Sequence, residues 1–131
     1  MTLNKKKVFI TGASGGIGKA LCEKFISNEY ILILTSSSKD KINSLKKHYG
    51  QKHFYYEVDI SNKNSLENCL NHISVEHKDL SILINNAGIT EDNLIFRMKE
   101  EQWNKVIQTN LNSNFFIIKS LLPNMLNNKY G

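Results

Sequence analysis

The stretch from Thr11 to Gly18 has the residue types and the spacing to bind an anion. It follows the apolar run Val8 to Ile10 and leads into residues 17–26, where apolar side chains recur at helical spacing. The sequence therefore predicts a buried strand, a turn and a helix. Glycine has no Cβ, which lets a ligand approach the backbone, and the first N–H groups of a helix lack intrahelical acceptors. A phosphate group fits such a turn, and the pyrophosphate of a dinucleotide fits it best; the alternative is a glycine-rich turn without a ligand.

The spacing of the glycines separates this turn from two similar phosphate-binding motifs. A P-loop requires a glycine at the position of Ala13 and a serine or threonine at the position of Ala20. The tighter Gly-x-Gly-x-x-Gly motif requires a third glycine at the position of Leu21. The chain satisfies neither pattern, and what remains is a Thr-Gly-xxx-Gly-x-Gly turn over residues 11–18.

A second polar segment follows residues 30–34, which are continuously apolar and predict a strand buried on both faces. Its tip reads Thr-Ser-Ser-Ser-Lys over residues 35–39, with no carboxylate before Asp40. Many NAD-binding folds carry an acidic residue near this position, which bonds the ribose 2′-hydroxyl. The hydroxyl groups of Ser36 and Ser37, with the lysine ammonium, can instead accept a 2′-phosphate, so the sequence favours NADPH over NADH. The alternative interpretation is an ordinary polar loop.

Two further strand ends carry polar groups. Asp59, next to Ile60, follows the strand predicted at residues 53–58, and its carboxylate can accept a bond from the amino group of adenine. A carboxylate beside a helix start is the alternative.

The segment Asn85 to Gly88, with two amides and two small residues, follows the strand predicted at residues 80–84. The small residues would let a cofactor approach the backbone, and an amide side chain could cross-link neighbouring loops. Here a polar turn is the alternative.

Strand and helix patterns alternate along the whole chain. Helical spacing recurs at residues 42–49, which end at Gly50, and at residues 66–73, after a cap at Ser61. A long helix is predicted from Trp103 to Met125, with a kink or an end at Pro123. Its predicted apolar residues are Trp103, Val106, Ile107, Leu111, Ile118, Leu122 and Met125. Apolar strands that alternate with helices predict an α/β fold, a doubly wound parallel sheet with helices on both faces. The 131 residues and the 40% hydrophobic content suit one domain.

The net charge of +5 comes from lysines spread along the chain, without an arginine-rich or aromatic-interleaved stripe. A solvated surface explains this charge better than nucleic-acid binding does.

Cys22 and Cys69 occupy apolar helical positions, so reduced, buried thiols are expected. The histidines lack the spacing of metal ligands, and no segment resembles a signal peptide or a membrane span. We expect a soluble protein of the cytoplasm or of an organelle matrix, with no metal, no nucleic-acid partner and no membrane contact.

Together, the turn at residues 11–18, Asp59, the segment Asn85 to Gly88, and Asn110 resemble the short-chain dehydrogenase/reductases over the whole chain. The run from Gly88 to Trp103, followed by Gln-Thr-Asn-Leu, is similar to the 3-oxoacyl-[acyl-carrier-protein] reductases of fatty-acid synthesis. This resemblance implies a Rossmann-type fold, NADPH as the cofactor, a substrate linked to acyl carrier protein, and a homotetramer. Because that carrier is acidic, the resemblance also gives a possible docking role to three cations, Arg97, Lys99 and Lys129.

The resemblance further implies the roles of individual residues. Asn110 is the catalytic candidate, because the matching asparagine in the family interrupts its helix and holds a water in a proton relay. Its spacing from Trp103 and Val106 predicts an amide on the apolar, buried face of the helix, and an amide bonded within the core is the alternative. Gly15 departs from related NADPH enzymes, which often carry arginine there. The cofactor-binding candidates are Thr11, Gly12, Ala13, Ser14, Gly15, Gly16, Ile17, Gly18, Ser36, Ser37, Asp59, Ile60, Asn86, Ala87 and Gly88.

The serine, tyrosine and lysine that complete the family's catalytic site are expected beyond the segment that this chain resembles. Residues 1–131 are therefore expected to be the amino-terminal portion of the nucleotide-binding domain, to bind cofactor weakly and not to turn over. Ile82 to Ile84 are expected at an unpaired sheet edge, which would leave the chain marginally stable or self-associating. Two alternatives remain open: a related reductase that acts on another alcohol or ketone, and a dinucleotide-binding protein without catalysis.

Overall fold

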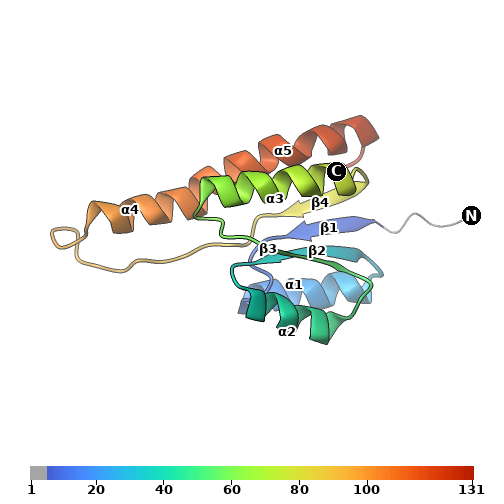
Figure 1. The fold of residues 1–131 in the computed structure, drawn as a ribbon, viewed down its shortest axis with the longest axis horizontal. Coiled ribbons are helices and arrows are strands. Elements are labelled where there is room, and N and C mark those ends of the chain that lie inside the picture. The colour runs from blue at the N-terminus through green and yellow to red at the C-terminus, as the bar shows by residue number, and fades with distance from the viewer. Residues whose placement is uncertain (1–5) are drawn as a thin grey trace, which may run out of the picture.

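The computed structural model describes residues 6–131 as one parallel sheet of four strands in the order β3-β2-β1-β4 (Figure 1). The register pairs Phe9 of β1 with Ile33 of β2 and with Leu83 of β4. The strand β4 pairs with β1 and forms an edge of the sheet described, and Ile82 to Ile84 are half-buried there. The strands are β1 (Lys7–Ile10), β2 (Ile31–Ser36), β3 (Phe54–Glu57) and β4 (Leu80–Ile84).

Helices cover both faces of the sheet, as the doubly wound prediction requires (Figure 1). One face carries α1 (Gly16–Ser27) and α2 (Lys39–Tyr49), and the other carries α3 (Lys63–Glu76) and α5 (Ser113–Asn128). The helix α4 (Glu100–Ile107) extends past the end of the sheet and reaches α5 through a π-helical turn, η1 (Gln108–Asn112). The predicted α/β class of a Rossmann-type sheet is confirmed.

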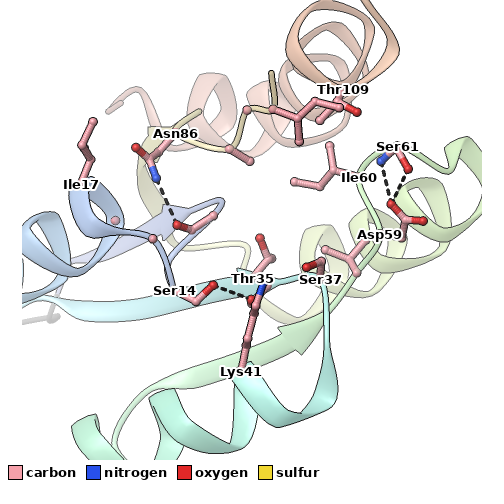
Figure 2. Close-up of a pocket in the computed structure, with 18 of the residues that line it drawn as sticks. Ser14, Ile17, Thr35, Ser37, Lys41, Asp59, Ile60, Ser61, Asn86 and Thr109 are labelled. Carbon is pink, nitrogen blue, oxygen red and sulfur yellow. Dashed lines mark hydrogen bonds between the residues drawn. The ribbon is translucent and has the colours of Figure 1, made fainter. Parts of the chain in front are cut away.

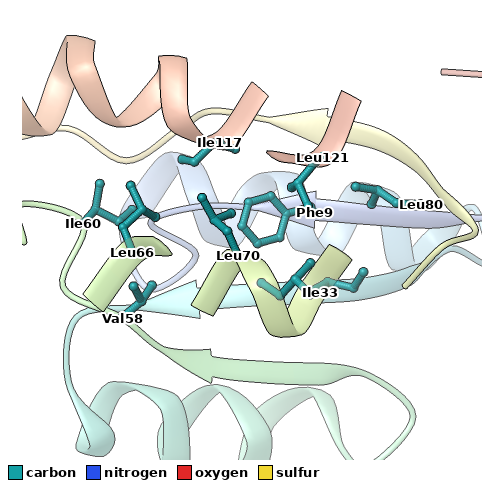
Figure 3. Close-up of a cluster of buried hydrophobic side chains, with 10 residues drawn as sticks. Phe9, Ile33, Val58, Ile60, Leu66, Leu70, Leu80, Ile117 and Leu121 are labelled. Carbon is teal, nitrogen blue, oxygen red and sulfur yellow. The ribbon is translucent and has the colours of Figure 1, made fainter. Parts of the chain in front are cut away.

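Each face of the sheet has its own apolar cluster, because the strands are apolar at consecutive positions and side chains alternate between faces. Phe9 points to the face of α3 and α5, where it lies among Leu70, Ile117 and Leu121 (Figure 3). Its neighbours Val8 and Ile10 point to the opposite face. There they join Leu32 and Leu34 of β2, Cys22 of α1, and Ile42 and Leu45 of α2.

Several element boundaries differ from the sequence prediction. The strand β2 runs two residues further than the apolar run, because Thr35 and Ser36 pair with Tyr56 and Glu57 of β3. The predicted cap at Ser61 is wrong: the α3 cap is Asn62, whose side-chain oxygen accepts the N–H of Ser65 at 3.0 Å. Gly50 does end α2, at a φ of 83°.

The apolar face predicted for the long helix is also wrong. The buried residues of η1 and α5 are Thr109, Ser113, Ile117 and Leu121, a row spaced four residues apart. Two members of this row are polar, so hydrophobic spacing could not identify it. The side chains chosen from that spacing, including Trp103, Leu111, Ile118 and Leu122, are exposed. The helix α5 also continues through Pro123 to Asn128.

Candidate functional site

A pocket of about 730 Å³ opens where the carboxyl ends of the strands meet the first turns of the helices (Figure 2). In open α/β sheets, ligands bind in the crevice at this edge. All the predicted site residues line it except Thr11, Ala13 and Asn110. Seven further lining residues are not among the candidates from the sequence: Thr35, Lys41, Val58, Ser61, Ile89, Lys105 and Thr109. Lys105 and Thr109 come from α4 and η1, far along the chain, so no local motif could have included them.

The glycines of the first turn have different tasks. Gly12 has a φ of 64°, and a Cβ on it would lie 2.9 Å from the Ala87 Cα. A Cβ on Gly18 would collide with the Gly12 carbonyl oxygen and approach the Ala13 Cα to 2.9 Å. These two glycines let the turn fold tightly against its neighbours. A Cβ on Gly16 would meet nothing within 4 Å, so this position faces open space.

The start of α1 provides donors to that open space. Its cap residue, Gly15, has no side chain, and no side-chain oxygen satisfies the first turn. The first N–H groups of a helix lack intrahelical acceptors, and the helix dipole places partial positive charge there. An anionic group next to Gly16 and Ile17 would complete the hydrogen bonds of the turn.

Thr11 and Asn86 tie the glycine turn to the end of β4 through four hydrogen bonds. The buried Thr11 hydroxyl oxygen accepts the backbone N–H groups of Asn86 at 3.0 Å and of Ala87 at 2.9 Å. In return, the Asn86 amide donates to the carbonyl oxygens of Thr11 at 3.1 Å and of Gly12 at 3.2 Å. Ala13 is buried and donates its N–H to the Thr35 carbonyl. Thr11 and Ala13 therefore support the pocket from beneath and do not line it.

The end of β2 forms a second corner of the pocket. The hydroxyl groups of Ser14 and Ser36 are hydrogen-bonded at 2.8 Å, which joins the glycine turn to the strand (Figure 2). Ser37 lines the pocket beside them. The lysine that lines this corner is Lys41 of α2, whereas Lys39, the cation named from the sequence, is not a lining residue. The two lysines are two residues apart in the first turn of a helix, where their side chains point in different directions.

The pocket carries more positive than negative charge. Its lining residues include the cations Lys41 and Lys105 and one carboxylate, Asp59. The Oδ1 atom of Asp59 already accepts two bonds, from the Ser61 N–H at 3.0 Å and from the Ser61 hydroxyl at 2.6 Å (Figure 2). Lys105 forms an ion pair with Glu91 at 3.1 Å at the surface. Such a lining suits a ligand with several negative charges.

Asn110 lies outside the pocket lining and is exposed, so its predicted burial is wrong. Its amide forms a two-point contact with the backbone of Ile89: Oδ1 accepts the Ile89 N–H and Nδ2 donates to the Ile89 carbonyl, both at 2.8 Å. The π-helical turn inserts an extra residue per turn, which breaks the helical spacing that connected Asn110 to Trp103. As the family resemblance implies, the helix is interrupted at Asn110.

Two hydroxyl groups in the pocket lack partners within the described chain. The Oγ1 atoms of Thr35 and Thr109 are buried and make no hydrogen bond. Both residues line the pocket, from β2 and from η1 (Figure 2). Buried polar groups are nearly always hydrogen-bonded, so these hydroxyls fit a polar ligand. Open space at Gly16, unsatisfied helix donors and net positive charge fit a dinucleotide phosphate.

A comparison with protein families agrees with this geometry: the family model for the short chain dehydrogenases matches residues 6–131. The chain belongs to this family. The resemblance of its motifs to the short-chain dehydrogenase/reductases is thereby confirmed.

Curated relatives share a more specific description. The 3-oxoacyl-[acyl-carrier-protein] reductase FabG of Buchnera aphidicola (Acyrthosiphon pisum) is 37% identical over 131 residues, which are 100% of this chain and 54% of that protein. The protein of the same name from Escherichia coli K12 is 35% identical over the same shares. The chain thus spans about half the length of the curated relatives it matches.

Solved structures share the fold. A short-chain dehydrogenase from Streptomyces avermitilis superimposes with a TM-score of 0.89 at 21% identity, over 100% of this chain and 48% of its own. A metagenomic short-chain oxidoreductase, solved in complex with NADP, superimposes with a TM-score of 0.87 at 25% identity, over 96% of this chain and 59% of its own. The oxidoreductase family and a nicotinamide dinucleotide cofactor are therefore supported together.

Within residues 6–131, no group of three or more histidine, cysteine or acidic side chains is placed to hold a metal ion. Over the same range, none of the helices combines the length and the hydropathy needed to cross a membrane. Cys22 and Cys69 are free thiols, and burial raises the pKa of each to about 11, which keeps them protonated and unreactive at neutral pH.

Proposed function

We propose that this chain forms the cofactor-binding portion of an NADPH-dependent 3-oxoacyl-[acyl-carrier-protein] reductase. The bound cofactor would supply a hydride to the 3-keto group of an acyl thioester carried by acyl carrier protein. The curated relatives of that name support the reaction class. Because the chain spans about half of their length, the activity, the substrate and the partners are proposals about the whole enzyme.

The arrangement at the end of β2 is the observation that favours NADPH over NADH. Ser14, Ser36 and Ser37 present hydroxyl groups there and Lys41 lines the same corner, while the one carboxylate of the pocket, Asp59, is hydrogen-bonded to Ser61. A 2′-phosphate carries negative charge, which a lysine and hydroxyl donors stabilise and a carboxylate would repel. We assign this corner to the 2′-phosphate of the adenosine ribose.

The remaining candidates receive roles from their positions. The turn from Gly12 to Gly18 would bind the pyrophosphate through its N–H groups, with Thr11 and Ala13 as its support. Asp59 and Ile60 would contact the adenine, and Asn86, Ala87 and Gly88 would line the path towards the nicotinamide. Asn110 would act as a positioning residue, because its amide fixes the backbone at Ile89 next to that path.

The partner is proposed from exposed cations, and the compartment from the free cysteines. Arg97, Lys99 and Lys129 are partly or fully exposed cations that could contact the acidic carrier protein. The free cysteines are consistent with a reducing compartment, either the cytoplasm or an organelle matrix. A homotetramer remains the expected state of the whole enzyme.

Titration of the 131-residue polypeptide with NADPH and NADH tests the proposal, with nicotinamide fluorescence as the readout. NADPH is expected to bind more tightly. Replacing Lys41 by glutamine should weaken NADPH binding by about tenfold, the effect of losing one charge-assisted hydrogen bond of about 1.5 kcal/mol, and should leave NADH binding unchanged. Lys39→Gln is the matched control, because it removes the same charge from the same helical turn outside the pocket.

Two results of these titrations would count against the proposed NADPH site. Equal affinity for the two cofactors, or an equal effect of Lys39→Gln and Lys41→Gln, would contradict the assignment of the 2′-phosphate corner.

A dinucleotide-binding protein without catalysis is the second candidate, because no tyrosine or histidine in residues 6–131 lines the pocket. Adding a 3-oxoacyl thioester to the NADPH complex addresses this candidate: we expect the 131-residue polypeptide to leave NADPH unoxidised.

A further inference from the structure

The amino end of the sheet, opposite the pocket, contains two buried histidines that the proposed reaction does not use. His53 precedes β3 and His77 follows α3, and their exposed fractions are 8% and 2%. The Nδ1 atom of His53 accepts the backbone N–H of Leu32 in β2 at 3.1 Å. A backbone N–H can only donate, so this nitrogen must carry a lone pair and the ring must be neutral.

His77 is part of a directed chain of hydrogen bonds. The Tyr56 hydroxyl lies 2.7 Å from the Glu76 Oε2 atom and 2.8 Å from the His77 Nε2 atom. A carboxylate can only accept, so the single proton of Tyr56 goes to Glu76 and the tyrosine oxygen must accept from His77. The proton of the neutral His77 ring is therefore on Nε2. Burial, with Glu76 beside it, raises the pKa of Tyr56, so the phenol keeps its proton.

The other nitrogen of His77 faces a lysine. The Lys7 ammonium of β1 lies 3.5 Å from His77 Nδ1 and forms an ion pair with Asp79 at 2.8 Å. An ammonium has only donors, which again leaves Nδ1 as an acceptor. The Phe54 ring of β3 packs edge-on against the imidazole, with the ring centroids 4.4 Å apart. His77 thus connects β1, β3 and the turn between α3 and β4.

We propose that His53 and His77 form an acid-sensitive latch across the amino end of the sheet, where both rings must stay neutral to hold neighbouring strands together. Protonating His53 would remove the acceptor for Leu32 and place a cation beside Lys52. Protonating His77 would set an imidazolium against Lys7, the ammonium that also pairs with Asp79. Acidification therefore loosens β2 from β3 and β1 from the turn between α3 and β4.

The surrounding charges determine the direction of the effect. Burial, and then Lys7, lowers the pKa of His77, while Glu76 and Asp79 act in the opposite direction without reversing it. Burial, and then Lys52, lowers the pKa of His53. The unfolded chain therefore binds more protons than the folded chain below the ordinary histidine value of 6.5. Stability is complete above that pH and is lost as the pH falls through it.

Urea unfolding of the 131-residue chain between pH 7.5 and 5.5 measures this loss. Far-UV circular dichroism is the suitable signal, because Trp103 is already exposed in the folded chain. Each histidine that is protonated only when unfolded should raise the unfolding constant by up to about tenfold per pH unit. Replacing His53 or His77 by glutamine should reduce this slope, whereas His72→Gln, at an exposed histidine on α3, should retain it.

A spectroscopic measurement on the unmodified chain keeps the test independent of the variants. Long-range ¹⁵N–¹H spectra of histidine-labelled protein should place the ring protons of both His53 and His77 on Nε2 at pH 7.5. Their titration midpoints should lie below the ordinary histidine value of 6.5. A proton on Nδ1, a normal midpoint for both buried rings, or a slope that His77→Gln and His53→Gln leave unchanged would overturn the latch. Cofactor binding enters none of these readouts.

Discussion

The glycines at residues 12, 16 and 18 differ in their surroundings, and therefore in what an added methyl group would contact at each position. Gly12 and Gly18 face backbone atoms, which cannot move aside. Gly16 faces the open pocket at the start of α1. One part of the motif therefore serves folding, and the other keeps space free for a ligand. A sequence motif alone presents all three positions as equivalent.

Alanine substitutions should separate these two tasks. Gly18→Ala should lower the free energy of unfolding by about 1–3 kcal/mol, because the added methyl overpacks against the Ala13 and Gly12 backbone. Gly16→Ala should raise it by roughly 0.5–1 kcal/mol, because alanine is the better helix former. The same Gly16 variant should bind NADPH at least about tenfold more weakly, a loss of about 1.4 kcal/mol. Urea denaturation and fluorescence titration measure the two effects, and a Gly16 variant that is stabilised but binds normally would contradict the placement of the phosphates.

At the scale of elements, the π-helical turn η1 connects the long helix to the site. It turns Thr109 towards the pocket and Asn110 towards the backbone of Ile89. The segment between β4 and α4, residues 85–99, is irregular, and Asn110 holds it in the way that a neighbouring strand would, with one donor and one acceptor. The interruption of the helix thus fixes a loop that borders the pocket.

Replacing Asn110 by alanine should release this loop. The loss of two exposed hydrogen bonds should cost about 1–2 kcal/mol of stability and accelerate hydrogen exchange at the Ile89 amide. Asn112→Ala is the matched control, because Asn112 is an exposed amide in the same turn that bonds to the Gln108 side chain instead. Amide exchange measured by NMR should distinguish the variants. Unchanged protection of Ile89 in Asn110→Ala would argue against the positioning role.

At the scale of the whole molecule, large apolar side chains remain exposed along one run of helix. We call this set the outer helix face; it consists of Trp103, Leu111, Phe115, Ile118, Leu122 and Leu126, with exposed fractions from 41% to 66%. A monomer rarely exposes so many neighbouring apolar groups without a partner. The expected homotetramer would bury this face, and self-association of the chain would follow from the same surface.

Polar substitution on the outer helix face should therefore shift the assembly towards smaller species. Phe115→Ser and Leu122→Ser should each weaken association by about 1.5–3 kcal/mol for each side chain that is buried between subunits. Val75→Ser is the control, because Val75 is an exposed apolar residue on α3 outside this face. Sedimentation velocity at several concentrations gives the assembly state. If the unmodified chain is monomeric throughout, the outer helix face is not a contact between copies of this chain.

The sequence by itself determined the class of fold and named most of the residues that line the candidate pocket. The glycine turn, the serine tip after β2, and the segments at Asp59 and Asn86 lie at the ends of apolar runs, and parallel strands bring their carboxyl ends to one edge. Continuous apolar runs, helical spacing and the conformational freedom of glycine are short-range properties. They can therefore be recognised without knowing what packs against what.

Only the tertiary structure decided which side chains beyond those strand ends reach the site. Lys41 lines the pocket and Lys39 does not, because the direction of a side chain depends on where α2 begins and how this helix lies on the sheet. Thr109 is buried and Asn110 is exposed, which is the reverse of what helical spacing predicted for Asn110. The extra residue in η1 rotates the helix, and the row that packs on the sheet includes the polar residues Thr109 and Ser113. The histidine pairings depend on contacts between residues distant along the chain, such as Lys7 with His77. Packing between remote segments sets these features, and hydrophobic spacing carries no information about it.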